Sequence, residues 1–344
     1  QGAQHAGMMK ELYEKNQTIR ETLDRGEALF KAQRGYSLLD LMFGDSTAIN
    51  STENTQPAIF LSSAAVYNVL SADGFNPRYF IGHSLGECSA LYCSGMLNFD
   101  DAMKLVLTRS KLMKEAAEKT AGEIMVVFRT WMETADLITK SGIKDIYVTN
   151  KNSDSQTVVA GSAAGIGEFT KHLKSGNVVF RKLQLSGAFH TPLFNSASEG
   201  LRRHLAGVRF NNVDFTRVIS NVTAKPYPQD EGAVKELLAK QVVSPVEFIE
   251  SVVYACQNGA SSFMEAGPSN LLTNLLKDIK TGVTAANATV DPKKGEIQSL
   301  ESARAVLRNE IISIKEPVMA EKKVTPSIPV SAVKSVKPVE IHME

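Results

Sequence analysis

The sequence predicts a protein of the α/β class, with parallel strands in its core and a smaller subdomain inserted into it. Long apolar stretches of helical length alternate with short apolar runs. A short strand, a glycine-bounded turn and a helix follow one another in residues 79–94, and a middle segment has the order βαββαβ.

The first part of the larger subdomain is expected in residues 1–115. Residues 57–70 (PAIFLSSAAVYNVL) are long and apolar enough for a mostly buried helix. Residues 79–81 form a short strand candidate that ends at Gly82, and residues 85–94 are rich in Ala, Leu and Cys, with Gly95 as a helix stop.

The middle segment, residues 116–195, is predicted to form a ferredoxin-like subdomain. The order of its elements is that of a split βαβ unit. The expected strands and helices, in chain order, are strand 124–128, helix 133–141, strands 146–148 and 156–160, helix 166–174 and strand 178–185.

The larger subdomain is predicted to resume in residues 196–290, and a tail to follow in residues 291–344. The expected elements are strands 217–220 and 262–265 and helices 233–241, 246–257 and 270–278. In the tail, Ile297, Leu300, Leu307 and Ile311 lie near helical spacing, which indicates one amphipathic helix. From Glu316 the chain is rich in Pro, Lys, Val and Ser without periodicity, as in disordered segments.

The composition is that of a soluble globular protein, with 43% hydrophobic and 22% charged residues. A formal net charge of +1 supplies no general attraction for nucleic acid or an anionic membrane. No apolar stretch approaches the roughly 20 residues of a membrane span. The three cysteines are an odd number, and Cys88 and Cys93 fit small core positions, which agrees with a reducing cytoplasm. As a separate expectation, the protein is a monomer.

Residues 82–86 (GHSLG) match the G-x-S-x-G pattern of a nucleophile elbow. Such a turn needs small residues on both sides because the serine is held in a strained backbone conformation. The following helix directs its first N–H groups at a reacting carbonyl. Ser84 is therefore the candidate nucleophile, and the N–H of Leu85 is the candidate oxyanion donor.

His190 is the candidate general base. It follows a predicted strand and precedes Thr191-Pro192, on a loop between the two predicted subdomains. A serine hydroxyl needs a neighbouring base to become a nucleophile near neutral pH. His83 lies inside the serine turn and is a less suitable base.

Arg109 is a candidate anion-binding residue in a helical segment. The alternative is an ordinary solvated helix arginine. A guanidinium binds a carboxylate through two parallel hydrogen bonds, which lysine cannot do.

No His/Cys/Asp/Glu spacing indicates a metal site. We expect no cofactor, and residues 161–167 (GSAAGIG) lack the Gly-Lys-Ser/Thr of a phosphate loop.

Five segments in consistent order resemble malonyl-CoA:acyl carrier protein transacylases, in particular the free-standing acyltransferases of polyketide synthases that lack their own. Residues 55–58 (TQPA) and 82–90 (GHSLGECSA) are similar to the family's TQPA and GHSLGEYSA segments. Residues 109–113 (RSKLM) and 187–190 (GAFH) are similar to RGKLM and GAFH, and residues 1–4 (QGAQ) to the end of GQGxQ. The resemblance covers residues 1 to about 280 and implies an α/β hydrolase-like core.

The resemblance implies a role for each matching residue. Ser84 would be acylated, His190 would be its base, and Arg109 would pair with the malonyl carboxylate. The remaining implied residues are Gln1 and Leu85, whose N–H groups would form the oxyanion hole, Gln241, whose backbone carbonyl would steady His190, and Phe189, which matches the malonyl-selective pattern.

Three positions depart from the family pattern. The strand that normally precedes Gln1 is expected to be missing, which affects one oxyanion donor. Cys88 stands where tyrosine is usual, and residues 267–269 (GPS) stand where GPG is usual.

The function expected from this reading is malonyl transfer from malonyl-CoA to the phosphopantetheine thiol of an acyl carrier protein, in polyketide or fatty acid biosynthesis, through an acyl-Ser84 ester. One alternative is an acyl hydrolase that clears stalled acyl groups from carrier proteins. Arg109 disfavours this, because relatives with that editing role tend to lack it. A non-catalytic acyl-recognition module is the other alternative, and it leaves Ser84, His190 and Arg109 without a purpose.

Overall fold

The computed structural model describes residues 2–183, 187–281, 283, 285–291 and 293–315, with side chains through residue 308. The chain divides into two compact units, Gln1–Leu307 and Arg308–Glu344. The strands that the structure describes all lie in the first unit.

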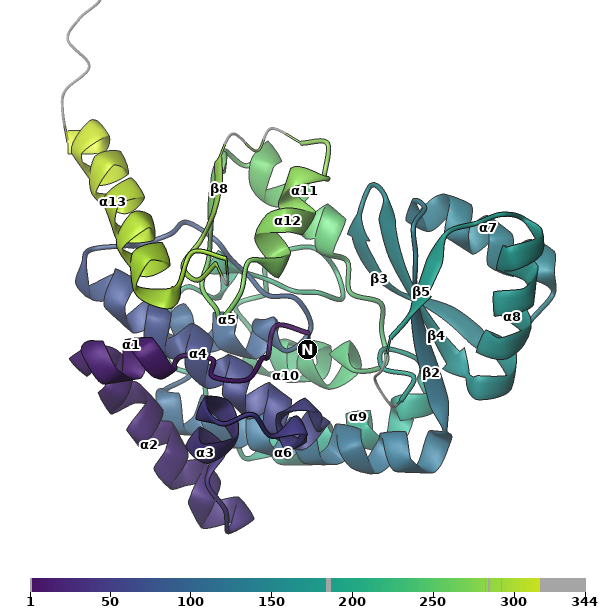
Figure 1. The fold of residues 1–344 in the computed structure, drawn as a ribbon, viewed down its shortest axis with the longest axis horizontal. Helices are drawn as coiled ribbons and strands as arrows, with labels where there is room; N and C mark the ends of the chain where they lie inside the picture. Colours follow the sequence, from purple (N-terminus) through teal and green to yellow (C-terminus); the bar gives the residue numbers. More distant parts are fainter. Residues whose placement is uncertain (1, 184–186, 282, 284, 292, 316–344) are drawn as a thin grey trace, which may run out of the picture. The chain divides into compact units, whose positions relative to one another are not determined.

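α4 (Thr52–Ala72) is the most deeply buried of a group of N-terminal helices, and it packs chiefly against α2 (Gln17–Arg34) and against α6 (Phe99–Thr120) (Figure 1). Residues 57–70, predicted as a buried helix, lie within α4. Apolar residues occupy every side of α4, and such a helix is stable only when neighbours cover it all round. The other elements of the group are α1 (Lys10–Lys15), α2 (Gln17–Arg34), α3 (Leu38–Phe43) and a 3-10 turn at Thr47–Asn50.

Two pairs of parallel strands provide the α/β character of the first unit. β1 (Phe80–Ile81) pairs in parallel with β6 (Val218–Ile219). β7 (Ser262–Glu265) pairs in parallel with β8 (Ala285–Ala288). The chain passes from β1 through a tight turn into α5 (Gly86–Cys93) and then α6 (Phe99–Thr120), as predicted for residues 79–94.

A four-stranded antiparallel sheet with the order β3-β4-β2-β5 forms the predicted βαββαβ segment. This order places the first and third strands in the centre, as expected for a ferredoxin-like unit. The last strand is shorter than the predicted strand 178–185, and residues 184 and 185 of that prediction lie outside the described residues. The elements are β2 (Gly122–Val127), α7 (Trp131–Ser141), β3 (Ile146–Ser153), β4 (Gln156–Ser162), α8 (Ala163–Ser175) and β5 (Phe180–Lys182).

Both faces of this sheet are buried. Alternate residues of a strand point to opposite faces, so the burial of neighbouring residues on one strand shows this. On β2, Met125 and Val127 belong to a small core beneath α7 and α8, which cover one face of the sheet (Figure 1). Ile124 and Val126 point the other way and join the large core of the first unit. The large core contains residues of both predicted subdomains, and both lie in one compact unit. The subdomain boundaries 1–115, 116–195 and 196–290 therefore stay predictions.

The remaining helices follow the four-stranded sheet in the chain. They are α9 (Asn195–Ala206), α10 (Glu231–Gln241), α11 (Phe248–Gln257), α12 (Leu271–Lys277) and α13 (Glu296–Lys315), with 3-10 turns at Pro192–Phe194 and Phe215–Arg217.

The helix expected in residues 291–344 exists as α13, and its first turns belong to the first unit. Leu300 and Leu307 are buried in the large core. The Glu296 carboxylate accepts hydrogen bonds from the N–H groups of Met9 (2.5 Å) and Leu12 (3.1 Å) at the start of α1. The packed unit thus extends past residue 290 through Leu307, whereas the segment predicted as disordered, from Glu316, lies outside the described residues.

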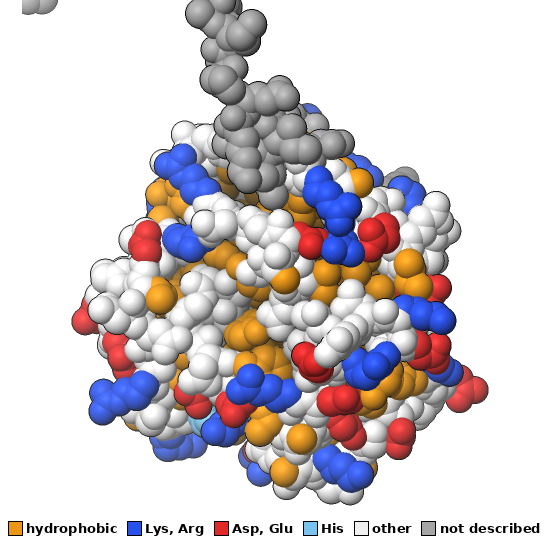
Figure 2. All heavy atoms as spheres, turned by 90° about the vertical axis from the view of Figure 1, so that its left-hand side faces the viewer, with side chains coloured by type: hydrophobic (Ala, Val, Ile, Leu, Met, Phe, Trp, Pro, Cys, Tyr) orange, Lys and Arg blue, Asp and Glu red, His pale blue; other side chains and the backbone are white. Residues whose placement is uncertain are grey.

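The face in Figure 2 mixes acidic, basic and hydrophobic side chains, with no large area of one charge. This agrees with the formal net charge of +1. Among the described residues, no helix has both the length and the apolar character that a membrane crossing requires.

Candidate active site

Ser84 lies on the sharp turn between β1 and α5, in a left-handed backbone conformation with φ 53°. This conformation is costly for a residue with a side chain, and at functional sites the surrounding structure holds it in place. Asn221 does so here: its Oδ1 accepts from the Ser84 N–H (2.7 Å) and its Nδ2 donates to the Gly82 carbonyl (2.7 Å).

The two glycines of the motif have different roles, and the expectation that both sides of the serine need small residues is wrong for one of them. A Cβ on Gly82 would lie 2.0 Å from the backbone nitrogen of Glu87. A Cβ on Gly86 would meet no atom within 4 Å. The first glycine is required because α5 begins directly against β1.

We therefore expect Gly82→Ala to lower the free energy of unfolding by about 3 kcal/mol or more, because backbone atoms must move. Gly86→Ala is the matched control, and we expect it to leave that free energy unchanged or to raise it by up to about 1 kcal/mol. Urea denaturation of both variants measures this. Equal destabilisation of both would contradict the assignment.

His190 lies next to Ser84 although the two are 106 residues apart, with 2.7 Å between Ser84 Oγ and His190 Nε2. Its Nδ1 lies 2.9 Å from the Gln241 carbonyl oxygen and 3.1 Å from that of Ser244. Carbonyl oxygens only accept hydrogen bonds, so Nδ1 carries the proton and Nε2 is free to accept from the serine. The structure therefore places the Gln241 carbonyl where the resemblance implied, and adds Ser244.

Burial, followed by the positive charge of Arg109, lowers the pKa of His190 to about 3. The imidazole is then neutral, and able to act as a base, throughout the neutral range. Because this pKa lies below the unfolded value, only the unfolded chain binds the proton between roughly pH 6.5 and 3, and stability falls as the pH is lowered through that window.

We expect the His190 ring signal in an NMR titration of the free enzyme to stay that of the neutral form down to about pH 4. His190→Asn identifies the signal by its loss. A midpoint near the ordinary histidine value would contradict the buried, cation-flanked setting. Arg109→Ala removes the charge and should raise the midpoint.

Arg109 projects from α6 to the same serine and is only 2% exposed. Its Nη2 lies 3.2 Å from Ser84 Oγ and 2.9 Å from Gln241 Oε1. Its Nη1 donates to Gln56 Oε1 over 2.6 Å. The alternative of a solvated helix arginine is therefore wrong. Burial lowers the pKa of Arg109, but a guanidinium remains charged in proteins.

The oxyanion donors can be located in part. Leu85 immediately precedes α5, and no acceptor among the described residues takes its backbone N–H. That N–H lies beside Ser84 and at the positive end of the helix, where a developing oxyanion is stabilised. Gln1, the other implied donor, lies outside the described residues.

Glu87 and Tyr227 are buried residues of the site that the sequence analysis did not identify. The fully buried Glu87 carboxylate accepts from Tyr227 Oη, the Asn221 N–H (3.1 Å) and Gln241 Nε2 (2.6 Å). Burial raises the pKa of Glu87, and these donors oppose the rise. The sequence signal that could have identified Glu87 is a charged residue in an Ala/Leu/Cys-rich helix, three positions after the candidate nucleophile.

His83 is held away from the reacting serine. Its Nε2 lies 2.8 Å from Asn152 Oδ1 on β3, and its ring packs edge-on against Phe248. Burial lowers the pKa of His83 to about 4, so it adds no positive charge to the site at neutral pH. This agrees with the expectation that His83 is not the base.

Phe189, next to His190 in the chain, points into the large core and packs edge-on against Phe194. The selectivity role implied for Phe189 stays a prediction. Cys88 is also buried, in keeping with a core position, and burial raises the pKa of its thiol to about 11.

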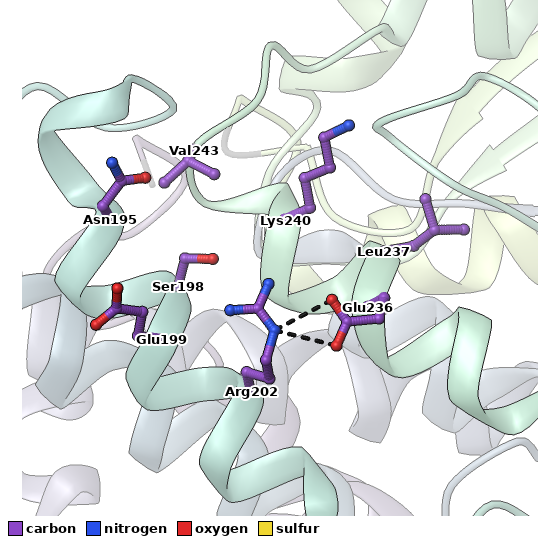
Figure 3. A pocket seen from close by; sticks show the side chains of 8 residues that line it. All are labelled: Asn195, Ser198, Glu199, Arg202, Glu236, Leu237, Lys240 and Val243. Atoms are coloured by element: carbon purple, nitrogen blue, oxygen red, sulfur yellow. Dashed lines mark hydrogen bonds and ion pairs between the residues drawn. The ribbon is translucent and has the colours of Figure 1, made fainter.

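A separate groove of about 510 Å³ lies between α9 and α10 and contains none of the candidate catalytic side chains (Figure 3). Arg202 and Glu236 form an ion pair across it. Its lining combines apolar surface with side chains of both charges, and no nucleophile–base pair is found among the residues that line it. Over the residues that the structure describes, no cluster of His, Cys, Asp and Glu could hold a metal ion.

The sequence and fold resemble those of known acyltransferases. Residues 1–309 match the acyl transferase domain family. The malonyl CoA-acyl carrier protein transacylase of Staphylococcus aureus (strain MRSA252) is 33% identical over 315 residues, which cover 90% of this chain and 97% of that protein.

Two solved structures are similar over comparable lengths. The malonyl CoA-acyl carrier protein transacylase from Clostridium perfringens has a TM-score of 0.81 and 31% identity, covering 92% of this chain and 97% of its own. A malonyl-transacylase in complex with its type II PKS acyl-carrier protein has a TM-score of 0.79 and 29% identity, covering 88% and 97%. These proteins match the chain in sequence and in α/β fold over nearly their whole length. The chain therefore belongs to the acyl transferase domain family, is similar to malonyl CoA-acyl carrier protein transacylases, and is an acyltransferase.

Proposed function

We propose that this acyltransferase moves a malonyl group from malonyl-CoA to the phosphopantetheine thiol of an acyl carrier protein, through an ester on Ser84. The observation that carries the proposal is the contact of one hydroxyl with both a neutral imidazole (2.7 Å) and a buried guanidinium (3.2 Å). The names of the similar proteins support the same substrate and acceptor.

In the first half-reaction, His190 Nε2 takes the Ser84 proton while Oγ attacks the thioester carbonyl. The tetrahedral oxyanion accepts a hydrogen bond from the Leu85 N–H. The carbon–sulfur bond then breaks, and the departing CoA sulfur receives the proton from His190. Malonate is left as an ester on Ser84, with its free carboxylate directed at Arg109.

The second half-reaction reverses these steps. His190 takes the proton of the phosphopantetheine thiol, and the sulfur attacks the malonyl-Ser84 carbonyl. The ester bond breaks, and Ser84 Oγ recovers its proton from His190. Carrier proteins of polyketide and of fatty acid biosynthesis present the same thiol, so both are acceptors to test.

Intact-protein mass spectrometry after incubation with malonyl-CoA, acetyl-CoA or methylmalonyl-CoA tests the proposal. We expect a malonyl adduct on Ser84 that disappears when phosphopantetheinylated carrier protein is added, with the label recovered on the carrier. Loss of the adduct as free malonate, faster than transfer, would instead favour the acyl hydrolase. Absence of any adduct would favour a non-catalytic acyl-recognition module.

A further inference from the structure

The charge of Arg109 has an unusual setting for a buried cation. The guanidinium donates hydrogen bonds to three neutral oxygens: Gln56 Oε1, Gln241 Oε1 and Ser84 Oγ. Within the described part of the chain, no carboxylate forms an ion pair with it. Buried charges are ordinarily paired, because an unpaired one loses its hydration without compensation. Arg109 is thus held firmly and left without a direct counter-charge.

The carboxylate of Glu87 lies near this charge but is separated from it by the side-chain amide of Gln241. The described partners of Glu87 act as donors: the Asn221 N–H, Gln241 Nε2 and Tyr227 Oη. The Asn221 N–H and Gln241 Nε2 can only donate, and such donors favour the ionised form of this carboxylate against the effect of burial. Gln241 joins the two charges, because its Oε1 accepts from Arg109 (2.9 Å) and its Nε2 donates to Glu87 (2.6 Å).

The orientation of both amides is fixed by their surroundings. Gln241 Nε2 also donates to the Ser84 carbonyl (2.7 Å), so its oxygen must face the guanidinium. Gln56 Nε2 faces the sulfur of Met113 (3.4 Å), which turns the Gln56 oxygen to Arg109. Gln56 and Gln241 are both buried, so water does not replace either acceptor.

We infer that Gln56 and Gln241 are specificity-determining positioning residues, which aim Arg109 at Ser84 with neutral acceptors and keep the nearest carboxylate one amide away. A carboxylate in direct contact would neutralise the guanidinium and repel an incoming acid. With amides in these places, the counter-ion that completes the site is the free carboxylate of the acyl group. This inference rests on the proposed malonyl transfer.

Gln56→Glu tests the inference, because it replaces one amide by a carboxylate of almost the same shape, 2.6 Å from Arg109 Nη1. We expect the preference for malonyl over acetyl loading, as a ratio of kcat/KM values, to fall about a hundredfold. The loss should be concentrated in KM for malonyl-CoA. Gln56→Met provides a neutral side chain of similar length, and we expect it to reduce the preference by less than about tenfold.

Gln33→Glu is the matched control, because it makes the same chemical change on the exposed side of α2. We expect it to leave both loading rates unchanged. Equal losses in Gln56→Glu and Gln56→Met would overturn the inference, since charge would then not decide the outcome. A wild-type enzyme that loads malonyl while Gln56→Glu keeps the full preference would overturn it too, with the proposed function intact.

Should Gln56→Glu fail to fold, as judged by circular dichroism, Gln241→Met carries the test. It removes the amide between Arg109 and Glu87 but keeps the backbone carbonyl that meets His190. We expect KM for malonyl-CoA to rise at least about tenfold, and the acid limb of kcat to stay in place. An unchanged KM would overturn the inference. A wild-type enzyme that forms no malonyl ester would remove the proposed function itself.

Discussion

Replacement of Ser84 by alanine is expected to abolish the malonyl adduct and to lower carrier-protein malonylation by a factor on the order of 10⁴–10⁶. The reason is that Ser84 carries the hydroxyl that the proposed base activates. Ser84 Oγ meets the unprotonated nitrogen of His190 at 2.7 Å. Mass spectrometry of the incubated protein and a radiolabelled transfer assay measure the two effects.

Ser89→Ala is the matched control for this prediction. Ser89 lies on α5, close to Ser84 in sequence, and its buried hydroxyl has no hydrogen-bond partner in the described part of the chain. Removing an unsatisfied buried hydroxyl is neutral or stabilising. We therefore expect Ser89→Ala to load malonate at the wild-type rate. A persistent adduct in Ser84→Ala would show that another residue is the nucleophile.

Arg109→Ala is expected to lower malonyl loading more than a hundredfold relative to acetyl loading. With malonate, the guanidinium exchanges water for a paired anion, whereas acetate leaves the buried charge unpaired. Such an uncompensated charge costs about 3–5 kcal/mol, which is the size of the discrimination expected. The kcat/KM ratio of the two thioesters, measured on wild type and variant, gives the result.

Two further variants separate the charge of Arg109 from its shape. Arg109→Lys keeps the charge but cannot reach Gln56 and Gln241 together as the planar fork does, so we expect an intermediate preference. Arg203→Ala removes an exposed arginine of α9 and should change neither rate. Equal losses of malonyl and acetyl loading in Arg109→Ala would refute a role in substrate choice.

Much of the fold could be predicted from local sequence. The apolar stretch 57–70 lies inside α4, and the strand, turn and helix around Ser84 are β1, the elbow and α5. The βαββαβ order was also predicted correctly, because strands and helices are each indicated by the periodicity of apolar residues within a short segment. What periodicity did not show is that β2 is buried on both faces, because this depends on what lies against the other side of the sheet.

The difference between Gly82 and Gly86 shows the same limit at a single turn. Gly82 and Gly86 are the two glycines of the same G-x-S-x-G motif, and the motif alone does not distinguish their roles. Only the approach of α5 to β1 brings the Glu87 backbone within 2.0 Å of a Cβ on Gly82 and leaves open space at Gly86.

By itself, the sequence determined which groups are candidates for the proposed chemistry: the hydroxyl of Ser84, the imidazole of His190 and the guanidinium of Arg109. Their motifs are local, because a strained turn or a loop end needs particular neighbours in the chain. The tertiary structure decided how these groups act, through Gln56, Glu87, Asn221 and the side chain of Gln241. These contacts join residues as far apart as Ser84 and Gln241, 157 positions along the chain, and only folding gives such buried polar groups their partners.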